Sequence, residues 1–149
     1  MNILITGGTG FLGSALTKRL IDRGESITLL SREPEKAVKR FGNINGIKDL
    51  QAIENTASIQ VIINLAGAPI FDAYWTAGRK QLIRASRIDL TNQLVALIAR
   101  LDVKPELLIS GSAIGFYGDQ ADIELTEQST SVPDFSQQLC ADWESSALS

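Results

Sequence analysis

Short apolar runs alternate along this chain with longer stretches in which apolar positions recur at helical spacing. The first run, Asn2–Thr6, has the composition of a buried strand. After a glycine-rich gap, three leucines at intervals of four residues mark one face of a helix that Gly24 ends; they are Leu12, Leu16 and Leu20. The start of the chain therefore predicts a strand, a turn and a helix.

The same alternation continues along the rest of the chain. Further strands are predicted at 27–30, 60–65 and 106–110, and helices at Pro34–Phe41, 76–101 and 135–148. The two long helices carry stripes at helical spacing: Leu82, Ser86, Leu90, Leu94, Leu97 and Leu101 in the first, and Phe135, Leu139, Trp143 and Ala147 in the second.

Between the second and fourth strands the pattern is weakest. Asn43, Asn45 and Gly46 break any strand near Ile44, and a helix is expected around residues 49–55. Alternating strands and helices nevertheless predict an α/β fold, a doubly wound parallel Rossmann sheet with helices on both faces and strand order 3-2-1-4-5. The chain stops after a helix, where such a domain normally has a sixth strand.

Composition narrows the classes of function. With 149 residues, 44% of them apolar, the chain fits one globular domain, and a net charge of -3 gives no reason to expect nucleic acid or an anionic membrane as a partner. One cysteine and no histidine argue against a metal site and against Ser-His-Asp chemistry. The apolar stretch at residues 3–5 is too short for a signal peptide or a membrane span, so the expected location is the cytoplasm.

The gap after the first strand is a glycine-rich turn, TGGTGFLG at residues 6–13. Glycines permit positive φ, leave room for a pyrophosphate, and let the helix pack closely on the strand, while its first amides and dipole bind the anion. The residues expected to bind a dinucleotide here are Gly7, Thr9, Gly10, Phe11, Leu12 and Gly13.

The turn has two other interpretations. A glycine-rich turn can be purely structural and bind nothing, although its position between a strand and a helix favours the dinucleotide. A P-loop also has the spacing of Gly8 and Gly13, but it requires Lys-Ser/Thr where this chain has Ser14 and Ala15. An NTPase is therefore not expected.

Cofactor choice is determined at the end of the second strand, where an NAD enzyme usually has a carboxylate. This chain has Ser31 and Arg32 there, and a guanidinium suits the 2'-phosphate of NADP. The predicted cofactor is NADP rather than NAD. The alternative is that Arg32 is a solvated surface residue.

Several motifs resemble a known family. The glycine turn, NLAG at 64–67 and SGSAIGFYG at 110–118 resemble the extended short-chain dehydrogenase/reductases, and WT at 75–76, SRID at 86–89 and FSQQLCADWE at 135–144 are similar to the YfcH-like epimerase family proteins. These are an atypical branch of the NAD(P)-dependent epimerase/dehydratases. The resemblance implies that the cofactor lies across the carboxyl ends of the strands, with Ala66 and Gly67 near its central ribose and Ser110 near the nicotinamide. As a plain alternative, such short turns suit any doubly wound sheet.

The wider superfamily relies on a Tyr and a Lys spaced Y-x-x-x-K, and this chain departs from that pattern. Counting back from Glu144 places Ser136 and Cys140 at those positions, and neither replaces a phenol or an ammonium well. The remaining catalytic candidates are Ser112 and Tyr117, which would polarise a substrate carbonyl, and Arg87, which would stabilise an oxyanion. Tyr117 is equally compatible with a packing role.

Two functions follow as hypotheses. The first is an NADP-dependent epimerase/dehydratase-like oxidoreductase that acts on a carbonyl or nucleotide-sugar substrate; the second is a noncatalytic NADP-binding sensor or scaffold. Family members are longer, so residues 1–149 are expected to be the N-terminal Rossmann domain of a protein whose substrate domain lies elsewhere. The predicted helices at 76–101 and 135–148 could form a homodimer interface, and the fifth strand is expected to have an open edge.

Overall fold

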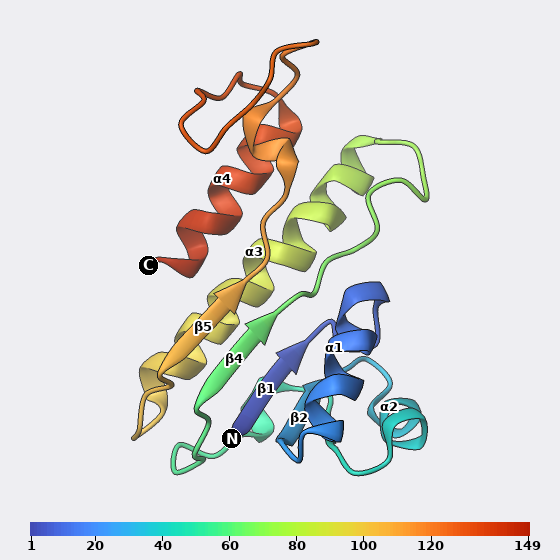
Figure 1. Ribbon diagram of the computed structural model, residues 1–149, viewed down its shortest axis with the longest axis vertical. Coiled ribbons are helices and arrows are strands. Elements are labelled where there is room, and N and C mark those ends of the chain that lie inside the picture. The colour runs from blue at the N-terminus through green and yellow to red at the C-terminus, as the bar shows by residue number, and fades with distance from the viewer.

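The computed structural model describes residues 1–149 and contains one five-stranded parallel sheet in the order β3-β2-β1-β4-β5 (Figure 1). The strands are β1 Asn2–Thr6, β2 Ser26–Leu30, β3 Asn45–Ile47, β4 Val61–Asn64 and β5 Leu107–Ser110. All four strand pairs are parallel. The predicted doubly wound α/β fold and its strand order are therefore confirmed.

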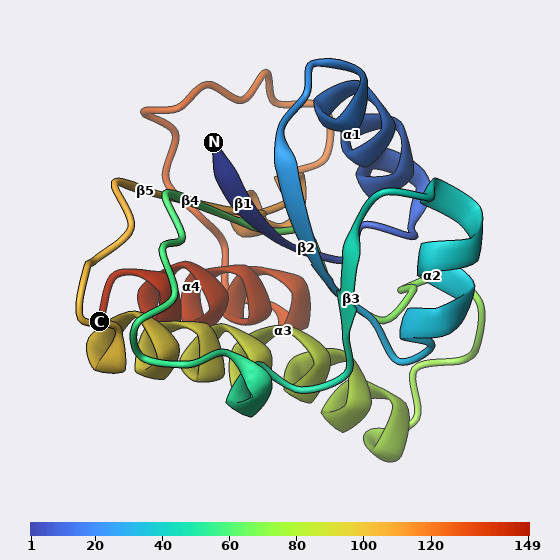
Figure 2. The same cartoon turned by 90° about the horizontal axis from the view of Figure 1, so that it is seen from below.

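Helices cover both faces of this sheet. They are α1 Phe11–Asp22, α2 Pro34–Phe41, α3 Ala77–Arg100 and α4 Phe135–Ala147, with short 3-10 turns η1 Leu50–Ala52 and η2 Ile114–Tyr117. Figure 2 shows α1 and α2 on one face, with α3 and α4 side by side on the other. None of these helices combines the length and apolar character needed to cross a bilayer.

Side chains that alternate along the strands supply two separate cores. Ile3 and Ile5 of β1 point toward α1 and α2, where they pack with Ile27, Leu29, Ala37 and Ile63. Leu4 points to the opposite face and packs with Ile62 and with leucines of α3. Each fully buried Leu or Ile stabilises the fold by about 1.5–3 kcal/mol. The two cores hold the carboxyl ends of the strands together, where the candidate site lies.

The buried faces of two helices differ from their predicted leucine stripes. Leu12 of α1 is 69% exposed, and the buried positions are instead Gly13 and Thr17, because the start of the helix lies too close to the sheet for a larger side chain. In α3, Leu82 is 48% exposed while its neighbour Ile83 is fully buried. The predicted stripe is therefore wrong at the beginnings of both helices.

The segment after α2 also differs from the prediction. Asn45 and Gly46 do not break a strand but form β3, a three-residue strand that pairs only with β2. Gly46 fits there because a Cβ would lie 2.9 Å from the carbonyl oxygen of Pro34 in α2. The helix expected at 49–55 is reduced to the turn η1, which Asp49 caps by accepting a hydrogen bond from the amide of Gln51 at 2.9 Å.

The far edge of the sheet is open, as expected for the fifth strand. β5 pairs only with β4. Leu108 packs against the α3 side, whereas Leu107 and Ile109, which point to the other face, are about half exposed. The β5 edge thus presents apolar side chains to solvent.

A buried polar network connects β1, β4 and the helices on the α3 side. The amide of Asn64 accepts a hydrogen bond from the Thr6 hydroxyl at 2.7 Å and donates to Thr91 at 2.9 Å and to Ser110 at 3.2 Å. Thr91 also accepts a hydrogen bond from the Trp143 indole at 3.0 Å and donates to a backbone carbonyl of α3. Buried polar groups that are fully paired in this way favour one arrangement of their elements.

We expect Thr91→Val to lower the free energy of unfolding by about 2–3 kcal/mol, because it removes the acceptor of the Trp143 indole and of one N–H of the buried Asn64 amide. Urea unfolding followed by circular dichroism measures this loss. Thr56→Val, at an exposed threonine, is the matched control and should stay close to the wild type. Equal stabilities for the two variants would contradict the importance of the network.

Candidate functional site

The glycine turn between β1 and α1 has positions at which the neighbouring backbone leaves no room for a side chain. Gly7 has φ +69°, and a Cβ there would lie 2.6 Å from the backbone carbonyl of Leu65. A Cβ on Gly13 would lie 2.1 Å from the carbonyl oxygen of Gly7, which also accepts the amide hydrogen of Gly10 at 3.0 Å. The turn therefore brings the beginning of α1 directly against the ends of β1 and β4.

The start of α1 is open for an anion. Its N-cap is Gly10, no side chain caps the helix, and the amides of Phe11, Leu12 and Gly13 donate to no acceptor in the chain. Free first-turn amides together with the helix dipole bind a diphosphate. Thr9 and the Phe11 side chain are exposed and do not plug the turn. The geometry thus fits the pyrophosphate of a dinucleotide.

The turn after β4 lies beside the glycine turn. The amide of Ala66 donates to the Thr6 hydroxyl at 3.3 Å. A Cβ on Gly67 would lie 2.8 Å from the guanidinium carbon of Arg87. Ser110, at the end of β5, accepts the hydrogen bond from Asn64. The structure therefore brings the residues predicted from the two short turns to one edge of the sheet.

At the end of β2, a small recess opens between the glycine turn and α2. Its volume is about 200 Å³, and its lining residues are Thr9, Ser31, Glu33, Lys36, Ala37 and Arg40. Arg32 is exposed and does not line the recess. Sequence reasoning missed Lys36 and Arg40, although their spacing of four residues on a predicted helix would have placed them on one face.

The guanidinium of Arg87, on α3, lies against Gly67 at the carboxyl edge of the sheet. Its Nη1 donates to the carbonyls of Ala68 and Ile83, both at 3.2 Å, and its guanidinium carbon lies 5.4 Å from the centre of the Trp143 ring. The side chain forms no ion pair with a carboxylate, and burial lowers the pKa of the guanidinium below its ordinary value. A positive charge without a carboxylate partner is thus held against Gly67.

The other two catalytic candidates lie after β5. The Ser112 hydroxyl donates a hydrogen bond to the carboxylate of Glu144 on α4, directly beside Trp143. Arg87 and Ser112 thus contact neighbouring residues of the same helix. Tyr117 lies in η2, half-buried, with its ring edge-on to Phe116 at 5.5 Å, and its hydroxyl forms no hydrogen bond to either candidate. Glu144 is a polar partner that the sequence had not singled out.

Ser136 and Cys140, which the count back from Glu144 placed at the superfamily's Tyr and Lys positions, pack against η2. Gly115 of η2 lies against Ser136, since a Cβ there would be 3.1 Å from the Ser136 Cβ and 3.6 Å from the Cys140 sulfur. Cys140 is buried, and burial followed by the charge of Glu144 raises the pKa of its thiol. A protonated thiol in this position is a filler of the α4 core rather than a nucleophile.

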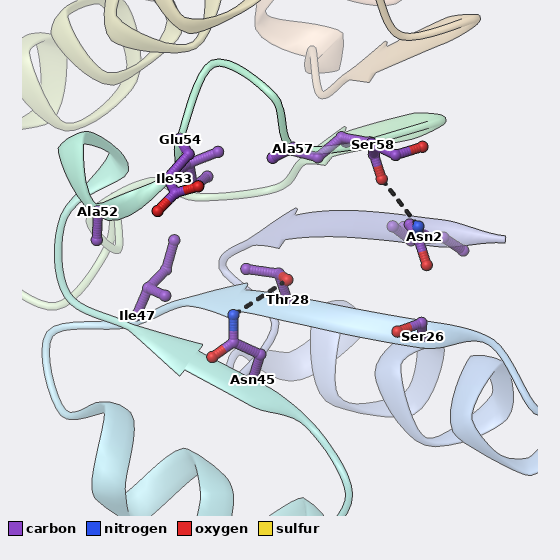
Figure 3. A pocket seen from close by; sticks show the side chains of 12 residues that line it. Asn2, Ser26, Thr28, Asn45, Ile47, Ala52, Ile53, Glu54, Ala57 and Ser58 are labelled. Atoms are coloured by element: carbon purple, nitrogen blue, oxygen red, sulfur yellow. Dashed lines mark hydrogen bonds between the residues drawn. The ribbon is translucent and has the colours of Figure 1, made fainter. Parts of the chain in front are cut away.

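A second cavity lies at the opposite end of the strands. It has a volume of about 470 Å³, and Figure 3 shows it between the sheet and the segment that follows η1. Asn2, Ser26 and Asn45, which begin three strands, contribute polar side chains to it. The cavity lies at the amino ends of the strands, whereas the glycine turn lies at their carboxyl ends.

We expect Gly13→Ala to lower NADPH affinity at least tenfold and to destabilise the fold by about 1–3 kcal/mol, because the added methyl forces α1 away from Gly7. Titration calorimetry and urea unfolding measure the two effects. Gly78→Ala adds the same methyl to α3 where no atom lies within 4 Å, so it should leave NADPH affinity unchanged and should not lower stability. Unaltered binding by Gly13→Ala would show that the turn does not hold the ligand.

Comparison with known proteins agrees with this geometry. The model of the NAD dependent epimerase/dehydratase family matches residues 3–139. The epimerase family protein YfhF of Bacillus subtilis is 41% identical over 147 residues, which are 97% of this chain and 48% of that protein. The chain thus spans about half the length of the curated relatives it matches.

Solved structures show the same fold. Human epimerase family protein SDR39U1 with NADPH has a TM-score of 0.82 at 29% identity, over 99% of this chain and 48% of that one. The nucleoside-diphosphate sugar epimerase from Corynebacterium glutamicum has a TM-score of 0.75 at 32% identity, over 99% of this chain and 30% of that one. With its 3-2-1-4-5 Rossmann sheet and open glycine turn, this chain belongs to the NAD dependent epimerase/dehydratase family.

Proposed function

We propose that this chain is the NADP-binding part of an epimerase/dehydratase-like oxidoreductase that acts on a carbonyl or nucleotide-sugar substrate. The observation that carries the proposal is the uncapped start of α1, where three free amides face the glycine turn. Such an arrangement, at the carboxyl end of the first strand of a doubly wound sheet, is the usual binding place of a dinucleotide pyrophosphate. Membership of the epimerase/dehydratase family supports the same conclusion.

NADP is favoured over NAD by the residues that follow β2. Ser31 and Arg32 stand where NAD enzymes usually have a carboxylate, and the nearby recess adds two further cationic side chains. A related human protein was solved with NADPH bound. Arg32 is free of ion pairs and can therefore turn its guanidinium toward a phosphate.

Ser112 and Arg87, at the carboxyl edge of the sheet, suit a reaction at a carbon atom that is bonded to oxygen. A bound nicotinamide supplies hydride transfer at this place. The Ser112 hydroxyl donates its one proton to Glu144, so in this arrangement it does not polarise a carbonyl as expected from the sequence. Its oxygen is free to accept a hydrogen bond from a substrate hydroxyl. Arg87 places its positive charge under the same turn, where it stabilises an oxyanion.

One observation favours the second candidate, a noncatalytic NADP-binding module. Ser136 and a buried, protonated Cys140 occupy the positions of the superfamily's Tyr and Lys. Neither side chain has the acidity of a phenol or the charge of an ammonium. A sensor or scaffold needs only the dinucleotide site and would tolerate this loss.

The proposed cofactor is tested by calorimetric titration with NADPH and NADH. We expect NADPH to bind more tightly, and Arg32→Ala to weaken NADPH binding by about 1–3 kcal/mol, the range of a charge-assisted hydrogen bond, with NADH binding nearly unchanged. Equal losses for both nucleotides would contradict a role for Arg32 in selection. No binding of either nucleotide at millimolar concentration would remove the proposal altogether.

The enzyme and the noncatalytic module differ in turnover. If the chain is part of an enzyme, the full-length protein should either lower the NADPH absorbance by reducing one member of a panel of carbonyl compounds, or convert a nucleotide sugar to a product seen by NMR, because epimerisation and dehydration return the cofactor to its starting state. Ser112→Ala should slow that reaction by about 10². Ser129→Ala, in an exposed loop, serves as the control. Tight NADPH binding by the full-length protein without turnover of any compound would favour the sensor or scaffold.

A further inference from the structure

We propose that the cavity at the amino ends of the strands binds a small organic ammonium ion that also carries hydroxyl groups. The cavity lies between β1, β2 and β3 on one side and residues 52–59 on the other (Figure 3). Its volume of about 470 Å³ is in the range of sites for small ligands. Because the glycine turn lies at the opposite edge of the sheet, this inference does not depend on the proposed function.

The floor of the cavity is a polar patch on the sheet. Asn2 of β1 is in register with Ser26 of β2, and Thr28 of β2 is in register with Asn45 of β3. Residues two apart in a strand share a face, and neighbouring strands are about 4.8 Å apart, so these four side chains lie side by side. Leu4, the partner of Thr28 in β1, already belongs to the apolar core. The polar patch is therefore confined to the amino end of the sheet.

Both asparagines of this floor keep their side-chain carbonyl oxygens free. Nδ2 of Asn2 donates to the carbonyl of Ser58 at 2.9 Å, and Nδ2 of Asn45 donates to the Thr28 hydroxyl at 3.5 Å, as Figure 3 shows. Neither Oδ1 accepts a hydrogen bond from the chain, and the hydroxyl of Ser26 has no partner in it. A ligand that contacts the two carbonyl oxygens therefore has to supply O–H or N–H donors.

The charge of the lining is negative. Glu54 is its one ionisable side chain, and it forms no ion pair. Its carboxylate accepts only a hydrogen bond from the Thr56 hydroxyl at 3.4 Å. The N-terminal ammonium, next to Asn2 in the chain, is paired with Glu25 and does not line the cavity. An unpaired carboxylate without a neighbouring cation favours a positively charged ligand and disfavours phosphates and carboxylates.

The wall opposite the floor is held in place by α3 and by the core. Arg100, the last residue of α3, donates to the carbonyl of Leu50 at 2.8 Å and to the side chain of Asn55 at 2.7 Å. Ile53 and Ile59 of the wall are buried in the core on the α3 side and also line the cavity. The cavity is therefore preformed, and its wall offers apolar contacts to the carbon atoms of a ligand.

An amino sugar has the groups that this lining would recognise: an ammonium for Glu54, hydroxyls for the asparagine carbonyl oxygens, and a compact carbon ring for the isoleucines. Glucosamine is therefore the probe, and glucose, with a hydroxyl in place of the ammonium, is its neutral counterpart. In NMR titrations of the full-length protein, we expect glucosamine to shift the backbone amide signals of Ser26, Asn45 and Glu54. Glucose should bind about fivefold more weakly, the size of effect expected for an exposed ion pair.

Variants separate the charge from the shape of the cavity. Glu54→Gln should lower the affinity for glucosamine about fivefold, to that of glucose, and leave the affinity for glucose unchanged. Ser26→Leu, at an exposed position of the floor, should fill the cavity and abolish the binding of both sugars. Glu127→Gln removes the same charge from an exposed loop outside the cavity and is the matched control.

The outcomes bear on the charge and on the site separately. Equal affinities for glucosamine and glucose, or an unaltered glucosamine affinity in Glu54→Gln, would overturn the selection of a cation. Signals that do not shift with either sugar, or that shift only outside the cavity, would overturn the site itself. Circular dichroism of Glu54→Gln and Ser26→Leu checks that each variant is folded, which both exposed positions should allow.

Discussion

The carboxyl edge of this sheet depends on one close contact between backbone atoms, that of Gly13 with Gly7. A Cβ on Gly13 would lie 2.1 Å from the Gly7 carbonyl oxygen, so only glycine lets α1 begin directly at the end of β1. The same approach leaves the first amides of α1 uncapped and turned toward the loop. Packing and anion binding are therefore two results of a single steric constraint.

The buried hydrogen-bond network around Asn64 fixes the same edge of the sheet against α3 and α4. Through Thr91 it connects the ends of the strands to Trp143 of α4, which in turn lies against Arg87. The two arginines Arg84 and Arg87 of α3 differ in whether their charge is paired. Arg84 is neutralised by Asp142, whereas Arg87 donates to backbone carbonyls and pairs with no carboxylate. The carboxyl edge thus has uncapped amides at the start of α1 and an unpaired positive charge at Arg87.

Most of the fold could be predicted because its pattern is local. Alternation of apolar runs is sufficient to locate four of the strands and all four helices within a few residues, and the glycine spacing marks the turn at β1. The errors have tertiary causes. Leu82 is exposed and Ile83 buried because the orientation of α3 is decided by the sheet beneath it. Asn45 and Gly46 form β3 because β2 offers an edge and α2 lies against Gly46.

The sequence by itself determined which residues can allow a close approach and which can bond a phosphate, since both follow from the chemistry of single side chains. It also showed the departure at Ser136 and Cys140. Only the tertiary structure decided which groups meet: that Ser112 donates to Glu144, and that a recess beside the glycine turn takes its charge from α2. These contacts join residues far apart in the chain, and no local pattern encodes the orientation in which two elements pack.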